Sequence, residues 1–267
     1  MRNHEKNVCI FVFAIALTLF GLDLFSQEAA PSVASPATGK GIYHAVCASC
    51  HGQNGKGDGS VSAYLKTKPR DFTMGTFKFR STPSGQLPTD QDLYRTMTAG
   101  VHTTSMPSFK MLAPEDRAAV IDYIKTFSPR FSDPGEYPLK PVEIGAPKPF
   151  TMASIVSGRK IYVEMRCGSC HGESGRGNGP SAKGLTDVWN HPIRPRDLTK
   201  AHESKLATDV SDIYRTFTTG LDGTPMPSYA DALTDDQRWD LANYVYSLQG
   251  KHEYYEWSET KKTGESK

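Results

Sequence analysis

Apolar side chains recur at helical spacing in two separate stretches of the chain, and the two stripes match position by position. Residues spaced three and four apart share one face of an α-helix, so each stripe predicts a helix that packs on a core. Pro114 suits the first turn of the earlier helix, and Thr234 with Gln237 forms a capping box for the later one. The two stripes are Val120, Tyr123, Ile124 and Phe127, and Leu241, Tyr244, Val245 and Leu248.

A second pair of helices is indicated by cap residues and by a repeated pentapeptide. Thr89 and Asp92 form a helix-start pattern, and Gly100 is placed to end the helix. The pentapeptide Asp-Leu-Tyr-Arg-Thr at Asp92 recurs as Asp-Ile-Tyr-Arg-Thr at Asp212, 120 residues later. Repetition of several motifs at this spacing predicts a tandem duplication.

The duplication has two irregularities. Pro-Arg-Asp-Phe-Thr at residues 69–73 is matched by Pro-Arg-Asp-Leu-Thr at residues 195–199, a spacing of 126. The spacing returns to 120 at Asp92, because the first copy has six extra residues within the segment 77–88. In addition, the Gly-x-x-x-Tyr pattern at Gly39 recurs at Gly158, but one extra residue precedes the motif that follows it.

These patterns divide the chain into two domains with connecting segments. We expect the first domain at 39–130 and the second at 151–250, followed by a polar tail at 251–267. The segment 131–150 contains five prolines and cannot be a continuous helix, so we interpret it as a semi-rigid linker. Two self-contained domains on such a linker should respond nearly independently to substitution.

The N-terminal residues have the profile of a signal peptide. Basic residues precede an uncharged, largely apolar run at Val8–Leu22, which Asp23 interrupts. We assign residues 1–26 to this leader and the small, Pro-containing segment 27–38 to a flexible spacer. The interpretation predicts an exported, periplasmic protein. The alternative is an uncleaved helix that anchors the protein to the periplasmic face of the inner membrane, although the run is shorter than a typical membrane span.

Composition excludes some classes of function. The formal net charge of +2 is close to neutral and gives no support to nucleic-acid binding. Of the five cysteines, one lies in the leader and four lie in two Cys-x-x-Cys pairs.

Each pair belongs to a Cys-x-x-Cys-His motif, which is the attachment site of a c-type haem. The copies are Cys47-Ala48-Ser49-Cys50-His51 and Cys167-Gly168-Ser169-Cys170-His171. The thiols add to the two porphyrin vinyl groups, and the histidine supplies one axial ligand to the iron. A shared zinc site is disfavoured, because zinc-binding pairs usually lie about 15–20 residues apart. A thioredoxin-like redox pair would need a βαβ pattern, and none is visible.

A repeated methionine is the candidate for the second axial ligand. Met106 and Met226 each follow their histidine by 55 residues, within the repeated pattern Gly-x-x-x-Thr-x-Met-Pro-Ser. Thioether sulfur is a soft ligand suited to haem iron. The alternative is that both methionines pack in a core. His102 lies near Met106, but the repeat has Asp222 in its place, so we expect His102 at the surface.

With these motifs, both halves resemble class I c-type cytochrome domains, and the chain over residues 39–250 resembles the periplasmic dihaem cytochromes c. The resemblance implies an all-α fold in which the first and last helices of each domain cross. Gly39 and Tyr43 would then meet the helix bearing Tyr123, and Gly158 and Tyr162 the helix bearing Tyr244. Arg70 and Arg196 are candidates for contacts to the haem propionates, and surface arginines beside a turn are the alternative.

The resemblance implies an electron carrier with two covalently bound haem c groups rather than an enzyme. Single electrons would pass between periplasmic or membrane-associated redox proteins, for example as part of a respiratory complex. Two alternatives remain at this stage: a dihaem enzyme such as a cytochrome c peroxidase, and an electron-transfer subunit of a larger oxidoreductase. A haem sensor would also need an output domain, which the sequence does not contain.

Overall fold

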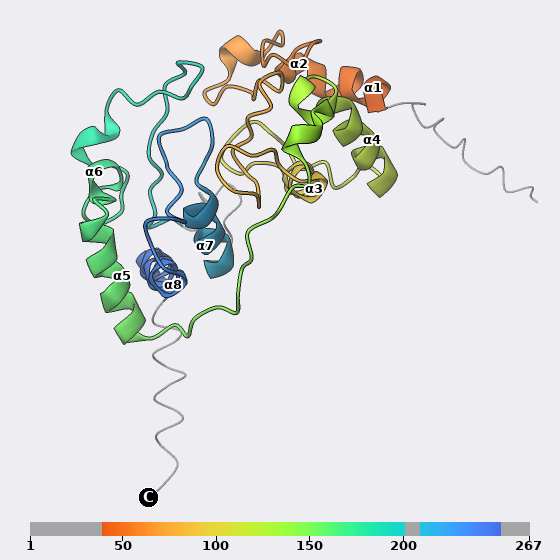
Figure 1. The fold of residues 1–267 in the computed structure, drawn as a ribbon. Helices are drawn as coiled ribbons and strands as arrows, with labels where there is room; N and C mark the ends of the chain where they lie inside the picture. Colours follow the sequence, from red (N-terminus) through yellow and green to blue (C-terminus); the bar gives the residue numbers. More distant parts are fainter. Residues whose placement is uncertain (1–38, 201–208, 252–267) are drawn as a thin grey trace, which may run out of the picture. The chain divides into compact units, whose positions relative to one another are not determined.

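The computed structural model describes residues 39–200 and 209–251 (Figure 1). The expected leader, the spacer at 27–38 and the tail beyond Lys251 lie outside the described residues. Helices and irregular loops make up the described part, where the one β-type contact is an isolated bridge between Thr186 and Pro192. The all-α prediction is therefore confirmed. Within this part no helix combines the length and apolar character that crossing a membrane requires.

The two halves contain corresponding helices. In the first half these are α1 (Gly39–Ile42), a π-helical turn (Tyr43–Cys47), α2 (Ala48–His51), α3 (Asp90–Ala99) and α4 (Pro114–Lys125). In the second half they are α5 (Met152–Glu164), α6 (Gly168–His171), α7 (Val210–Thr219), α8 (Asp235–Tyr246) and a π-helical turn (Ser247–Lys251). Short 3-10 turns occupy Ser62–Tyr64, Pro129–Ser132, Pro134–Glu136 and Pro180–Ala182.

The helix boundaries follow the cap residues identified in the sequence. The Thr89 hydroxyl accepts a hydrogen bond from the Asp92 backbone N–H, and the Asp92 carboxylate accepts from the backbone N–H of Thr89. Gly100 ends α3 with a φ of 71°, a left-handed value that glycine adopts without strain. Thr234 and Gln237 form the equivalent capping box at the start of α8.

Each half is held together by a close crossing of its first and last helices (Figure 1). A Cβ atom added to Gly39 would lie 1.9 Å from the Ala119 carbonyl oxygen, and one added to Gly158 would lie 2.0 Å from that of Asp240. Only glycine permits backbones to approach this closely. The aromatic contacts beside the glycines also repeat, with ring centroids 5.3 Å apart for Tyr43–Tyr123 and for Tyr162–Tyr244. The helix crossing that the family resemblance implied is confirmed in both halves.

The extra residue of the second half is absorbed in a turn. In the first half the helix widens into a π-helical turn that ends at Cys47. In the second half α5 ends at Glu164 and the chain passes through Arg166 at a φ of 53°. Both tyrosine hydroxyls still donate to the same loop carbonyl, Tyr43 to Gly52 at 2.8 Å and Tyr162 to Gly172 at 2.6 Å. The two haem motifs therefore begin in equivalent positions.

The Pro-rich segment and several side chains connect the two halves directly. The Val142 N–H donates to the Ser81 carbonyl at 2.7 Å, and Lys148 pairs with Asp240 at 2.8 Å, so the segment contacts both halves. The Arg95 guanidinium also pairs with Asp212 across the halves at 2.8 Å. These contacts differ from the expectation of nearly independent domains on a linker. The reason is long-range pairing of polar groups, which the local sequence pattern does not reveal.

Candidate haem sites

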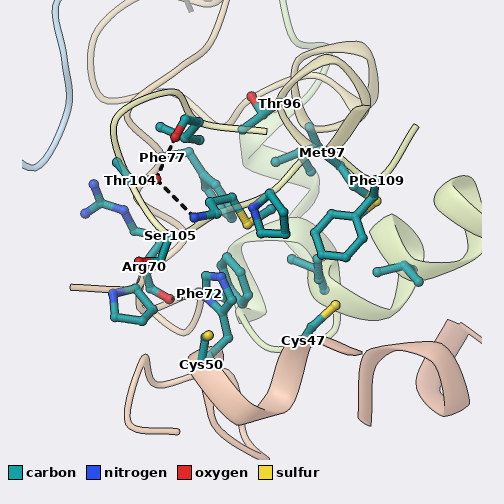
Figure 2. Close-up of a pocket in the computed structure, with 18 of the residues that line it drawn as sticks. Cys47, Cys50, Arg70, Phe72, Phe77, Thr96, Met97, Thr104, Ser105 and Phe109 are labelled. Carbon is teal, nitrogen blue, oxygen red and sulfur yellow. Dashed lines mark hydrogen bonds between the residues drawn. The ribbon is translucent and has the colours of Figure 1, made fainter. Parts of the chain in front are cut away.

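The first candidate site is an apolar pocket over the Cys-x-x-Cys-His motif (Figure 2). Its walls come from α2, the segment 65–79, α3, the loop 101–109 and α4. Figure 2 shows Cys47 and Cys50 on one wall, with Phe109 and Met97 across the cavity. The chain thus brings together all five residues that the sequence assigned to the first site: Cys47, Cys50, His51, Arg70 and Met106.

The four motif cysteines are not joined in disulfides, and all are partly buried. Cys47 and Cys167 each pack against the hydrophobic core of their half. Burial raises the pKa of both thiols to about 11, because the apolar surroundings disfavour the thiolate. Two unpaired thiols at the edge of an apolar pocket fit the attachment of a porphyrin.

Each motif histidine is oriented by a backbone carbonyl. His51 Nδ1 lies 3.0 Å from the Arg70 carbonyl oxygen, and His171 Nδ1 lies 3.1 Å from that of Arg196. A carbonyl only accepts hydrogen bonds, so Nδ1 must carry the proton, which leaves the Nε2 lone pair free. Burial lowers the pKa of both imidazoles and favours this neutral form. A neutral ring with a free Nε2 is the form that coordinates a metal.

The glycine-rich loop after each motif runs against the Pro-Arg-Asp segment, whose arginine carbonyl orients the histidine. The Gly57 N–H donates to the His51 carbonyl at 2.8 Å, and the Gly177 N–H donates to that of His171 at 2.7 Å. Gly57 has a φ of 74°, and a Cβ there would lie 2.7 Å from the Pro69 carbonyl oxygen. The loop can therefore pass close to the Pro-Arg-Asp segment only with glycine at this position.

The loops that carry the candidate methionines have the same hydrogen bonds in both halves. The Met106 N–H donates to the Thr104 hydroxyl at 3.1 Å, and the Met226 N–H donates to that of Thr224 at 3.2 Å. Each threonine hydroxyl also donates to the carbonyl three residues before it, at 2.7 Å in both loops. Figure 2 draws these bonds around Thr104 as dashed lines. The repeated motif thus specifies one loop conformation twice.

The two arginines of the repeated Pro-Arg-Asp segment differ in their side-chain contacts. The Arg70 guanidinium is 4.1 Å from the ring centroid of Trp189 in the second half, and the Arg196 guanidinium donates to the Lys200 carbonyl at 2.9 Å. What the two positions share is the backbone carbonyl that orients the histidine. Sequence reasoning chose these residues for their charge and missed this backbone role. The signal that could have revealed it is the repetition of the whole segment.

Other expected and unexpected residues can be placed as well. His102 is exposed, as predicted, and lies on the loop before Met106. Phe72 stacks on the His51 ring at a centroid distance of 4.4 Å, a contact that the sequence analysis did not identify. Its counterpart is Leu198, which packs against the core of the second half. An apolar residue directly after Pro-Arg-Asp in both copies is the signal that could have indicated it.

The comparisons with known proteins agree with this geometry. Residues 36–128 and 155–249 each match the family model described as cytochrome c. The chain belongs to the cytochrome c family and consists of two tandem domains of that family. It therefore binds two covalently attached haem c groups, as the sequence predicted.

Two curated relatives are subunits of an oxidase. The chain is 26% identical over 224 residues to the Cbb3-type cytochrome c oxidase subunit FixP of Azorhizobium caulinodans, covering 80% of this chain and 60% of that protein. It is 23% identical over 227 residues to subunit CcoP of an Azospirillum species, covering 80% and 62%. The match thus spans less than two thirds of either relative.

A solved structure is more similar in sequence. A chain of the Kuenenia stuttgartiensis reducing HAO-like protein complex Kustc0457/Kustc0458 shares 46% identity with this chain at a TM-score of 0.76. The similarity covers 79% of this chain and 94% of that one. Together these relatives support a role in electron transfer.

Proposed function

We propose that this protein transfers single electrons between redox proteins through two haems, each ligated by a histidine and a methionine. The single observation that carries the proposal is the repetition of both ligand settings. The Nδ1-to-carbonyl bond of His51 recurs at His171, and the loop bonds of Met106 recur at Met226. An enzyme that binds a substrate at one iron would be expected to differ between its two sites.

The protein residues have definite tasks in this proposal. Cys47 and Cys50 attach the first haem, and Cys167 and Cys170 the second. A bound haem iron supplies a centre that accepts and releases one electron. The backbone carbonyls of Arg70 and Arg196 hold the histidine rings in one orientation, so that little rearrangement accompanies a change of charge. The apolar pocket excludes water, and a methionine ligand raises the reduction potential.

Comparison within the repeat favours Met106 over a second methionine in the same pocket. Met97 also lines the pocket and is buried, but its counterpart 120 residues later is Phe217. A ligand common to both halves cannot be supplied by that position. Met97 therefore packs in the core and serves as a matched control for Met106.

The partners and location follow by similarity and from the sequence. Relatives carry the names of oxidase subunits and of a chain in an HAO-like complex, which supports assembly with a larger oxidoreductase. The apolar N-terminal run supports export to the periplasm. N-terminal sequencing of the mature protein should begin between residues 26 and 37. A retained Met1 would instead favour a membrane anchor.

A redox titration combined with carbon monoxide binding tests the function. The protein should take up one electron per haem, two per chain, and the reduced form should not bind carbon monoxide because both irons are fully ligated. Met106→Ala should open one site to carbon monoxide, whereas the control Met97→Leu should not. Rapid carbon monoxide binding by the unaltered protein, or sustained turnover of hydrogen peroxide with a reductant, would favour the enzyme alternative.

A further inference from the structure

The loop that carries Met226 is held by the other half of the protein. Asp222, four residues before Met226, accepts three hydrogen bonds from the first half. Its carboxylate receives the Arg80 guanidinium and the Ser84 hydroxyl, each at 2.8 Å, and the Gly85 N–H at 2.8 Å. All three donors lie in the segment 77–88, which contains the six extra residues of the first half.

Arg80 is the centre of this segment. Its side chain is fully buried, and its Nε donates to the Pro83 carbonyl at 3.1 Å. Its Nη2 reaches across to the Thr219 carbonyl at 2.6 Å, at the end of α7 where the Met226 loop begins. One guanidinium therefore contacts both the start of the loop and Asp222 within it.

The segment is itself anchored to the first half, so it can hold the loop in a fixed position. The Thr82 hydroxyl donates to the Leu87 carbonyl at 2.7 Å, and both groups are buried. The Ser81 N–H and hydroxyl each donate to the Asp92 carboxylate at 2.9 Å, which ties the segment to the start of α3. These bonds fix the part of the segment that directly follows Arg80.

Among the residues that the structure describes, the loop of the first site receives no equivalent hydrogen bond or ion pair from the other half. His102 stands where the second loop has Asp222, and both His102 and Thr103 are exposed, whereas Asp222 and Gly223 are partly buried. The second half also has six fewer residues than the first between the Pro-Arg-Asp segment and the Asp-x-Tyr-Arg-Thr motif. The internal bonds of the two loops are the same, so the difference lies in the external contacts alone.

We propose that the segment 77–88 of the first domain is a clamp that positions the Met226 loop, with Arg80 and Asp222 as its positioning residues. The proposal rests on the proposed ligation by Met226. In consequence the sixth ligand of the second haem is displaced less readily than that of the first. Opening the second loop must break the contacts to Asp222 and leave the buried Arg80 charge without its carboxylate.

Cyanide binding to the oxidised protein tests the clamp. Cyanide binding is followed in a Met106→Ala background, where the first haem has an open position and binds cyanide rapidly. The remaining slow phase of binding then measures how fast Met226 is displaced from the second haem. Asp222→Asn should accelerate this phase about tenfold or more, because it removes the charge of the acceptor and so weakens the hydrogen bonds that hold the loop. Ser84→Ala, at an exposed position, should accelerate it by a smaller factor. The matched control Arg95→Gln breaks another ion pair between the halves but does not touch the loop, and should change the rate less than about twofold.

The outcomes separate the clamp from the ligation on which it rests. A near-infrared sulfur-to-iron band that Met226→Ala leaves intact would overturn the ligation and the clamp with it. If Met226→Ala removes its share of the band but Asp222→Asn leaves the rate of the slow phase unchanged, the ligation stands and the clamp is overturned. If Asp222→Asn does not yield holoprotein, Ser84→Ala decides by the same criterion: a faster phase supports the clamp, and a rate equal to that of the Arg95→Gln control contradicts it.

Discussion

Substitution of Gly158 by alanine should separate the two helices that define the second domain. The new Cβ would lie 2.0 Å from the Asp240 carbonyl oxygen and 2.7 Å from the Tyr244 Cβ. Neither neighbour is the end of a flexible side chain, so α5 and α8 must move apart. The movement would also loosen the contact between Tyr162 and Tyr244 beside the haem motif.

Two opposing terms set the size of the effect. Adding atoms to a close-packed core lowers the free energy of unfolding by about 1–3 kcal/mol. The added Cβ of Gly158→Ala would meet backbone atoms at very short distances, so we expect a loss near the upper value. Alanine is favoured over glycine in a helix by about 1 kcal/mol. We therefore expect the free energy of unfolding to fall by about 2 kcal/mol.

Chemical denaturation followed by the haem absorption of the second domain measures this change. Gly168→Ala is the matched control, because the first half already has Ala48 at that position and the nearest atoms to an added Cβ lie 3.7 Å away. The control should leave the stability within about 0.5 kcal/mol. An equal midpoint and slope for Gly158→Ala and Gly168→Ala would refute the proposed role of the helix crossing.

Three further predictions concern local contacts and stoichiometry. Tyr162→Phe removes the hydrogen bond from the tyrosine hydroxyl to the Gly172 carbonyl, which keeps the Gly175 N–H as a donor, so it should lower the free energy of unfolding by about 1 kcal/mol; a change below about 0.5 kcal/mol in denaturation would contradict this. Thr89→Ala removes the capping box with Asp92 and should cost about 1 kcal/mol; unaltered stability would show that the Ser81 contact to Asp92 suffices. Intact-mass spectrometry after acid–acetone extraction should find two haems retained, and one haem or none would contradict covalent attachment at both motifs.

The helices and the ligand settings were predictable because their causes are local. A cap such as Thr89 with Asp92, or an apolar stripe such as that of α8, depends on residues within one or two turns. The duplication added information that a single copy would not carry. It singled out Met106 and Met226 as candidate ligands, because each stands at the same place in the repeated Gly-x-x-x-Thr-x-Met-Pro-Ser pattern.

The contacts between the halves were not predictable in the same way. Arg80 and Asp222 are far apart in the sequence, and a buried ion pair leaves no periodic pattern. The role of Arg70 was also hidden, because its carbonyl rather than its guanidinium orients His51, and any residue has a carbonyl. The unequal spacing of the repeat was the sequence feature that pointed to the segment 77–88, but its partner became evident only in the fold.

The near-infrared sulfur-to-iron band of the oxidised protein tests the central claim most directly. If Met106 and Met226 each ligate one iron, the band should have the intensity of two haems. Each methionine-to-alanine variant should lose about half of it and lower the reduction potential of one haem. Met97→Leu should retain the full band. A band that survives Met106→Ala or Met226→Ala unchanged, with unchanged potentials, would contradict methionine ligation at that site.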